Sequence, residues 1–363
     1  MKYIREFRNP HLAKPLIERI QEYAGPALRF MEFCGGHTHA IMRYGIRSLV
    51  APMVELVSGP GCPVCVSATA DLDRAIALAE VPGVILTTFG DMIRVPGSQE
   101  SLQNAKARGA DVRIVYSSLD AVQMARENPD RPVIMLGVGF ETTAPTIAAS
   151  VMHAEREGIA NFFVLSLHKL TPPATRAILD AGEVHLDGII GPGHVTTIIG
   201  EAGWGFLPRD YGLSCAVSGF EPLDMLQAIA ALIELAVGGQ PGVRNVYGRS
   251  VTMHGNPVAL DMMYRVFRIE AADWRGMGVV PGSGLGFRDE YARFDAMRAF
   301  PVEVPTPVEH TGCRCGEVLR GVLLPTDCPL FGKVCDPVHP VGPCMVSAEG
   351  ACAAHYQYRA EPL

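Results

Sequence analysis

The sequence lacks several features that would each define a class of protein. It has no run of Lys and Arg, and its 31 basic residues are outnumbered by 38 acidic ones, giving a formal net charge of −7. Charged residues interrupt the N-terminal segment, so it has no signal-peptide core. The most apolar stretch, 223–239, is broken by Asp224, Gln227 and Glu234 and falls short of the roughly 18 apolar residues of a membrane span. We therefore expect a cytoplasmic protein with no nucleic-acid or membrane partner.

The composition is that of a folded globular protein. The chain has 363 residues, of which 48% are hydrophobic and 19% charged. This length suggests two or three domains, and the hydrophobic content is sufficient for a core in each of them. Long disordered segments are not expected.

Short apolar runs alternate with helical segments from about residue 28 to 235. This alternation predicts parallel sheets with helices on both faces, an α/β fold. The expected helices are 70–80, 119–128, 147–158 and 174–181. The expected strands are 28–33, 54–58, 83–88, 112–117, 132–137, 162–167 and 186–190.

The pattern predicts two lobes of similar plan and a third region. One strand ends in GPGC (59–62) and a later one in GPGH (191–194), and NPDRP (128–132) interrupts the alternation between them. From about residue 243 onward, Gly and Pro become frequent and strands are hard to recognise. We therefore expect an α/β lobe over 1–130, a second over 131–242, and a C-terminal, cysteine-rich iron–sulfur domain over 243–363.

Polar motifs directly follow the expected strands. Ligands of open α/β sheets bind beyond the carboxyl ends of the strands, so these motifs should gather around one cleft between the lobes. They are CGGHTH, GPGCPVC, FGDM, GFETTAP, LHKLTPP and GPGH.

Ten cysteines carry the strongest chemical signal, and six of them lie between residues 313 and 352. A reducing cytosol makes a disulfide framework improbable, so metal binding or redox chemistry is the better interpretation. The tail spacing is C-x-C-x12-C-x6-C-x8-C-x7-C, which is neither a zinc ribbon nor a bacterial ferredoxin pattern. It favours a single 4Fe-4S cluster over structural zinc or plain buried thiols.

Two further cysteine motifs lie in Gly-rich loops. Cys62 and Cys65 form a C-x2-C pair that can chelate one metal or close a reversible disulfide. Cys34 precedes an expected helix, whose N-terminus should lower the pKa of its thiol. His37, three residues on, strengthens the interpretation of Cys34 as a catalytic or metal-binding thiol, whereas His39 is as readily a helix cap or core residue.

Two other features carry less weight. The PGSGLG segment (281–286) superficially resembles a dinucleotide loop, but no clear helix follows it. Cys215 lies in an apolar, strand-like run and is expected to be a core residue.

Taken in order, the motifs resemble those of the NiFe-hydrogenase maturation factor HypD family over essentially the whole chain. They are FCGGHTHAI, ELVSGPGCPVC, TTFGDMIRVPGS, GFETTAPT, GPGHV and CPLFGKVCDPVHPVGPCMVSAEGACAA. The resemblance implies two α/β domains and a cluster-bearing third domain. It also implies a scaffold that assembles the Fe(CN)2CO group with a HypC-like small chaperone and a HypE-like cyanide donor.

On this basis Cys34 is expected to hold the iron while it receives cyanide and carbonyl ligands. The cluster would supply electrons through Cys62 and Cys65, unless that pair itself binds iron. His37 and His194 are expected to hydrogen-bond the iron's ligands or to tune Cys34.

Four tail cysteines are chosen as cluster ligands, with Cys313 and Cys344 as substitutes or as a flanking pair. The chosen four are Cys315, Cys328, Cys335 and Cys352. The rival hypotheses are a stand-alone iron–sulfur thiol/disulfide oxidoreductase and a zinc-stapled binding module.

Overall fold

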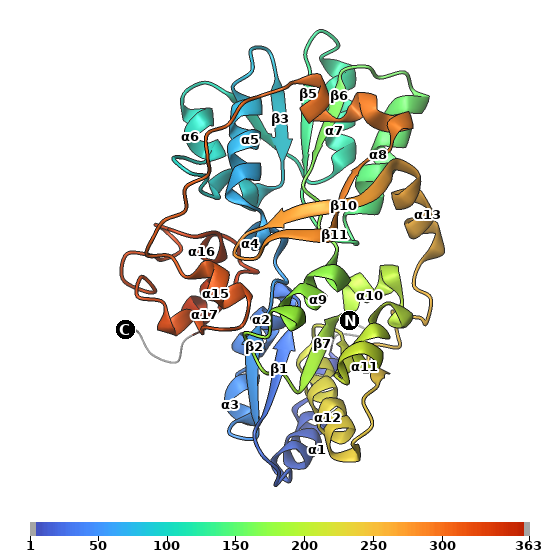
Figure 1. Ribbon diagram of the computed structural model, residues 1–363, viewed down its shortest axis with the longest axis vertical. Coiled ribbons are helices and arrows are strands. Elements are labelled where there is room, and N and C mark those ends of the chain that lie inside the picture. The colour runs from blue at the N-terminus through green and yellow to red at the C-terminus, as the bar shows by residue number, and fades with distance from the viewer. Residues whose placement is uncertain (1–4, 359–363) are drawn as a thin grey trace.

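The computed structural model describes residues 5–358 and has two α/β lobes with a β-hairpin between them (Figure 1). Both large sheets are parallel throughout. The predicted α/β class with two parallel-sheet lobes is therefore confirmed.

The first lobe is built on a five-stranded sheet in the order β2-β1-β7-β8-β9. Its strands are β1 (Leu28–Glu32), β2 (Val54–Ser58), β7 (Gly188–Pro192), β8 (Ser214–Ser218) and β9 (Val243–Asn245). Its helical elements are η1 (Glu6–Arg8), α1 (Pro10–Gln21), α2 (Gly35–Arg43), α3 (Ile46–Val50), α9 (Thr171–Ala181), α10 (Gly193–Ile199), η3 (Glu201–Trp204), α11 (Phe206–Tyr211) and α12 (Pro222–Gly238).

Both faces of this sheet are apolar because successive strand residues point to opposite sides. Phe30 and Ile190 pack with the helices α1, α2 and α12 on one face. Met31, Ile189 and Cys215 pack on the other face in the cluster that also contains residues of α9, α10 and α11. The sheet is thus buried on both sides, as parallel sheets require.

The second lobe is built on a four-stranded sheet in the order β4-β3-β5-β6. Its strands are β3 (Ile85–Thr88), β4 (Asp111–Ile114), β5 (Val133–Gly137) and β6 (Phe162–Ser166). Its helical elements are α5 (Thr69–Ala79), η2 (Gly90–Arg94), α6 (Leu102–Ala107), α7 (Ser118–Glu127) and α8 (Ala144–Arg156).

The antiparallel hairpin of β10 (Phe267–Trp274) and β11 (Gly278–Phe287) lies where the chain crosses between the lobes. Trp274 pairs with Ser67 at one crossing, and Gly284 pairs with Lys169 at the other. The buried Trp274 indole donates a hydrogen bond to the Ser283 hydroxyl at 2.8 Å, which satisfies its N–H inside the core. The 281–286 segment lies inside β11, so its resemblance to a dinucleotide loop was misleading.

The remaining elements are α4, which follows β2, and those of the C-terminal region, which contact both lobes. They are α4 (Pro63–Val66), α13 (Pro257–Val266), η4 (Asp289–Phe294), α14 (Ala296–Ala299), α15 (Cys315–Leu319), η5 (Pro325–Asp327), α16 (Pro343–Val346) and α17 (Ala351–Gln357). The strand β9 joins the first sheet, α13 packs on α8, and α14 packs on β6. The tail helices pack on α2 and α4; Leu319 and Met345 belong to the same buried cluster as Met31 of the first sheet, whereas Val346 packs in the core of the second lobe.

The predicted boundaries at residues 130 and 243 therefore do not coincide with the sheets. The strand β5 pairs with β3 across the first boundary, and β7 pairs with β1. The GPGC and GPGH strands, β2 and β7, flank β1 in one sheet and do not represent two lobes. Strand pairing between distant segments overrides proximity in sequence here.

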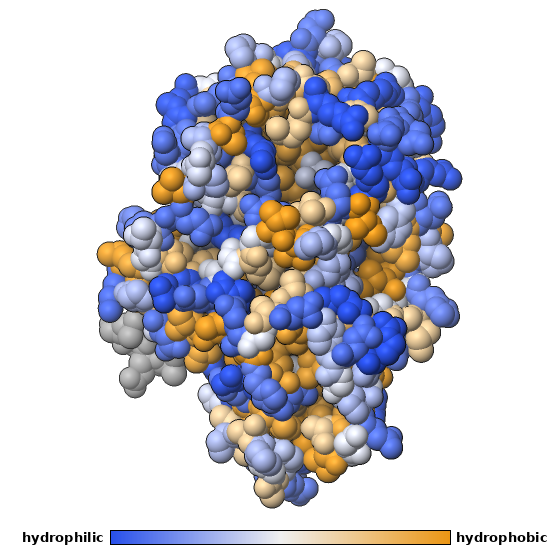
Figure 2. Space-filling view, in the orientation of Figure 1, coloured by the Kyte–Doolittle hydropathy of each residue, from blue (hydrophilic) through white to orange (hydrophobic). Residues whose placement is uncertain are grey.

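The face in Figure 2 carries hydrophobic residues in scattered groups over the hairpin and the first lobe. Ile269 and Val279 of the hairpin are among the exposed apolar side chains. Within residues 5–358, no helix combines the length and the hydropathy needed to cross a bilayer.

Candidate functional site

Cys34 lies at the carboxyl edge of the first sheet. It directly follows β1 and Phe33, and its backbone caps the start of α2. Because β7 is the neighbour of β1, its carboxyl end brings His194 to the same edge. The Cys34 Sγ lies 3.7 Å from His194 Nδ1, and the cysteine is 4% exposed.

A buried carboxyl group holds the Cys34 backbone. Glu32 Oε2 accepts a hydrogen bond from the Cys34 N–H at 2.8 Å, and Oε1 interacts with the Thr38 hydroxyl. Burial raises the pKa of Glu32 to about 8, against smaller opposing effects of its hydrogen bonds with Thr38, Cys34 and Ser58. The group is therefore mainly protonated at neutral pH, and the loop before α2 is fixed without a buried charge.

The structure corrects the expected electrostatics of Cys34. The sequence predicted a thiol pKa lowered by the helix N-terminus, but burial raises the pKa of the Cys34 thiol well above its usual range. Burial also lowers the pKa of His37 to about 3 and that of His194 to about 4. At neutral pH the site thus contains a neutral thiol beside neutral imidazoles, and no thiolate–imidazolium pair.

The two histidines of the CGGHTH motif differ in position. His37 is fully buried, and its Nε2 lies 3.3 Å from the Ser218 carbonyl oxygen. Its Nδ1 has no partner among the described residues. His39 Nε2 lies 2.8 Å from the Tyr358 hydroxyl, with the two rings edge to face, so it ties α2 to the tail.

Cys62 and Cys65 form a disulfide at the start of α4. Their loop lies directly against Cys34, because the Gly35 N–H donates to the Gly61 carbonyl at 3.1 Å. A Cβ on Gly61 would lie 2.2 Å from the Cys34 nitrogen, so only glycine permits this approach. The free thiol and the disulfide are thus adjacent parts of one site.

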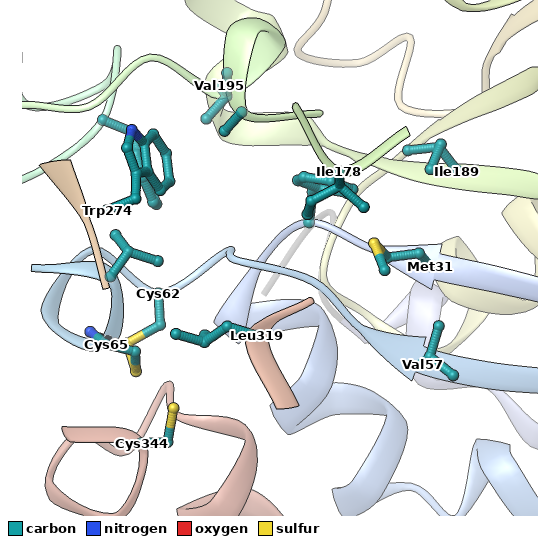
Figure 3. Close-up of a cluster of buried hydrophobic side chains, with 14 of the residues drawn as sticks. Met31, Val57, Cys62, Cys65, Ile178, Ile189, Val195, Trp274, Leu319 and Cys344 are labelled. Atoms are coloured by element: carbon teal, nitrogen blue, oxygen red, sulfur yellow. Dashed lines mark hydrogen bonds between the residues drawn. A yellow bond between two sulfur atoms is a disulfide. The ribbon is translucent and has the colours of Figure 1, made fainter. Parts of the chain in front are cut away.

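The tail approaches the same disulfide from the other side. Cys65 Sγ lies 4.0 Å from the Pro343 carbonyl oxygen, at the start of the helix that carries Cys344 (Figure 3). Cys344 Sγ in turn lies 2.7 Å from Cys315 Sγ, and Cys344 also contacts Cys352.

The other tail cysteines lie around this group. Burial raises the pKa of Cys313 and of Cys335; the nearby thiols of Cys315, Cys352 and Cys328 add to the rise at Cys313, and those of Cys352 and Cys328 add to it at Cys335. Over residues 5–358, no three or more His, Cys, Asp or Glu side chains are arranged to hold a metal ion.

The polar residues that follow strands of the second sheet form hydrogen bonds that join neighbouring helices and strands. Glu141 accepts hydrogen bonds from the backbone and hydroxyl of Thr171, both at 2.7 Å, which caps α9. The buried Lys169 ammonium donates to the Asp273 carbonyl at 2.7 Å. Cys215 is a buried core residue of β8, as predicted. The six motifs therefore form two groups, one at each sheet, and the hairpin and the tail lie between them.

The sequence interpretation missed Glu32 and Phe220. Phe220 packs against His37 and His194, with ring centroids 5.1 and 5.3 Å away. A signal for it existed, because the tripeptide GFE occurs twice, at 139–141 after β5 and at 219–221 after β8.

These features define a class: a two-lobed α/β protein in which a buried free thiol stands beside a C-x2-C disulfide and a group of six further cysteines. The sequence model of the family described as "HypD: Hydrogenase formation hypA family" matches residues 11–359. The chain belongs to this HypD family of hydrogenase maturation factors.

Curated relatives are similar to the chain over nearly their full length. The hydrogenase maturation factor HypD of Azotobacter vinelandii is 48% identical over 99% of this chain and 97% of its own. That of Rhodobacter capsulatus is 46% identical over 99% and 98%, respectively. That of Escherichia coli strain K12 is 43% identical, also over 99% and 98%.

Proposed function

We propose that this chain is the scaffold on which, together with a HypC-like small chaperone, the Fe(CN)2CO group of NiFe hydrogenase is assembled. The observation that carries the proposal is the contact between Cys34 and His194 at 3.7 Å, beside a closed disulfide. In this arrangement one thiol is available for iron and a separate pair is available for electrons.

Iron is the substrate of this site, and Cys34 is its ligand from this chain. A thiol must lose its proton to bind a metal. His194 Nδ1 lies close enough to hydrogen-bond the thiol, and burial lowers the pKa of His194 to about 4, so the imidazole stays neutral and positions the sulfur while iron displaces the proton to solvent. The HypC-like partner supplies a second cysteine, and a HypE-like donor delivers cyanide. The net charge of −7 supports protein partners over nucleic acid.

The disulfide favours a redox role for Cys62 and Cys65. Sulfur atoms bonded to each other are not thiolate ligands, so the pair as it stands accepts two electrons and two protons and does not chelate iron. We therefore assign these two cysteines to an electron relay, one of the two roles left open by the sequence.

A 4Fe-4S cluster in the tail fits the donor chemistry, because thiolates are the ligands of such clusters. When bound, it would supply electrons one at a time. The 2.7 Å contact between Cys315 and Cys344 favours treating these two as a pair. We therefore revise the ligand set, with Cys315 replaced by Cys313, to Cys313, Cys328, Cys335 and Cys352, because Cys328 and Cys352 each lie close enough to act electrostatically on both Cys313 and Cys335.

The test is infrared spectroscopy of the anaerobically purified complex with the chaperone. Iron-bound cyanide and carbonyl bands are expected for the native chain and absent for Cys34→Ala. Cys215→Ala is the matched control, because that thiol is also buried but lies in the sheet core. Retained bands in Cys34→Ala would refute the assignment.

A stand-alone thiol/disulfide oxidoreductase is the alternative, favoured by the Cys62–Cys65 disulfide. It requires turnover of a disulfide substrate by the chain without the chaperone. Such turnover, combined with no diatomic infrared bands in the complex, would favour this alternative over the scaffold.

A further inference from the structure

Phe220 places an apolar ring among the polar residues of the thiol site, and the proposed function gives it no role. It follows β8, the neighbour of β7, so its ring reaches the same edge as Cys34 and His194. The ring is tilted 32° to His37 and 51° to His194, at centroid distances of 5.1 and 5.3 Å. One aromatic ring therefore contacts both imidazoles of the thiol site.

Phe220 also borders the thiol itself. A Cβ on Gly36 would lie 3.1 Å from Phe220 Cδ1 and 3.5 Å from Cys34 Sγ, so the ring and the sulfur adjoin the same small space. Cys34 is 4% exposed, whereas Phe220 and His194 are both partly exposed. The two rings thus form part of the layer that separates the sulfur from solvent.

A second aromatic residue supports Phe220 from behind. Tyr247 packs edge to face with it at 6.2 Å. A Cβ on Gly193 or on Gly219 would lie 2.6 Å from the Tyr247 ring, and these glycines directly precede His194 and Phe220. Tyr247 thus supports both segments at once, and only glycines permit the close approach.

The support continues to an ion pair whose carboxylate is buried. The Arg249 guanidinium lies over the Tyr247 ring at 4.4 Å and donates two hydrogen bonds to Asp224, at 2.7 and 2.6 Å. Asp224 is completely buried in the first turn of α12. The position of the Phe220 ring is therefore fixed by Tyr247, which Arg249 and Asp224 hold in turn.

We propose that Phe220 is a positioning residue that holds His37 and His194 in place around Cys34 and closes the thiol against water. This deepens the proposed function, and it rests on that function for its purpose, since water competes with diatomic ligands for iron. Aromatic packing between rings fixes their orientation, and the apolar ring removes water from the sulfur.

The test measures the reactivity of the thiol itself in the full chain, prepared anaerobically. Iodoacetamide labelling is followed by mass spectrometry of two tryptic peptides, 30–43 and 210–244. The first contains Cys34 as its only cysteine and the second contains only Cys215. The variants are Phe220→Leu, which removes the planar ring, and Phe220→Tyr, which retains it.

Phe220→Leu should raise the labelling rate of Cys34 by roughly tenfold or more while Cys215 stays unlabelled, because only the local barrier to solvent is lost. Phe220→Tyr should label Cys34 at close to the native rate. Phe300→Leu is the matched control: Phe300 is also partly buried and packs edge to face with another ring, Phe163, in the second lobe. It should leave both rates unchanged.

An unchanged Cys34 rate in Phe220→Leu would overturn the proposal. So would a parallel rise at Cys215, which would indicate general loosening, or a Phe220→Tyr variant as reactive as Phe220→Leu. If Phe220→Leu does not fold, Tyr247→Leu provides the test, with a smaller rise expected at Cys34 alone. The scaffold proposal is tested by infrared bands, so the two can fail independently.

Discussion

Cys34 and His194 are 160 residues apart in the chain, yet the thiol sulfur and the imidazole Nδ1 lie 3.7 Å apart. The contact exists because β1 and β7 pair in parallel and end at the same edge of the sheet. Burial keeps the thiol protonated and the imidazole neutral, so the imidazole can hold the sulfur in place until a metal displaces the thiol proton.

His194→Gln should weaken iron binding without unfolding the chain. Loss of a neighbouring group that orients a metal ligand typically costs about 10- to 100-fold in metal affinity. The measurement is anaerobic Fe(II) titration, with Cys34→Ala as the baseline. His185→Gln is the control, because His185 is exposed at the surface, and it should bind like the native chain. Native affinity in His194→Gln would contradict the role of the contact.

Glu32→Gln should change how stability depends on pH. The folded-state pKa of Glu32 is raised to about 8, above its ordinary value of 4.5. The folded state therefore binds the proton more tightly than the unfolded state does. The resulting contribution of Glu32 to the free energy of unfolding is fully present below about pH 4.5 and is lost as pH rises through 8. Glutamine does not ionise, so the variant should gain stability relative to the native chain between pH 5 and pH 8, by at most about 1.4 kcal/mol per pH unit.

Urea midpoints of both proteins at several pH values would measure this difference. Other buried groups titrate in both proteins, so their effects cancel in the difference. Glu141 is one of them, because burial raises its pKa to about 7. Parallel profiles for Glu32→Gln and the native chain would show that Glu32 does not retain a proton in the folded state.

Substitutions in the tail should separate the paired cysteines from the cluster ligands. Cys315→Ser and Cys344→Ser should retain iron, acid-labile sulfide and the absorbance near ~400 nm, because these two thiols contact each other. Serine at position 313, 328, 335 or 352 should abolish all three signals. Equal loss in Cys315→Ser and Cys313→Ser would refute the revised ligand set.

Gly61→Ala should be strongly destabilising for a steric reason. The added methyl would lie 2.2 Å from the Cys34 backbone nitrogen, which cannot move without displacing the thiol loop. We expect a loss of about 1–3 kcal/mol in the free energy of unfolding, measured by urea denaturation. Gly238→Ala is the matched control, because Gly238 lies in α12 with open space around its Cα, and it should be neutral or slightly stabilising. Similar effects of the two substitutions would exclude the steric explanation.

The local elements were predictable because apolar periodicity is a local property. All seven predicted strands exist, each with both ends within three residues of the prediction, and the long apolar stretch is the helix α12. The family was also predictable, since the ordered motifs lie in contiguous sequence. The hairpin was not, because the Gly-rich segment of β11 lacks strand-like alternation and is held by its contacts with both lobes.

The sequence by itself named the thiols and histidines that are candidates for the chemistry and predicted that parallel sheets would present them. Only the tertiary structure decided which strands are neighbours, and therefore that Cys34 meets His194 and that Cys315 meets Cys344. It also decided the sign of the pKa shift at Cys34, where burial outweighs the helix N-terminus. The physical reason is the same in each case: strand pairing and desolvation depend on contacts between distant segments, which spacing along the chain does not specify.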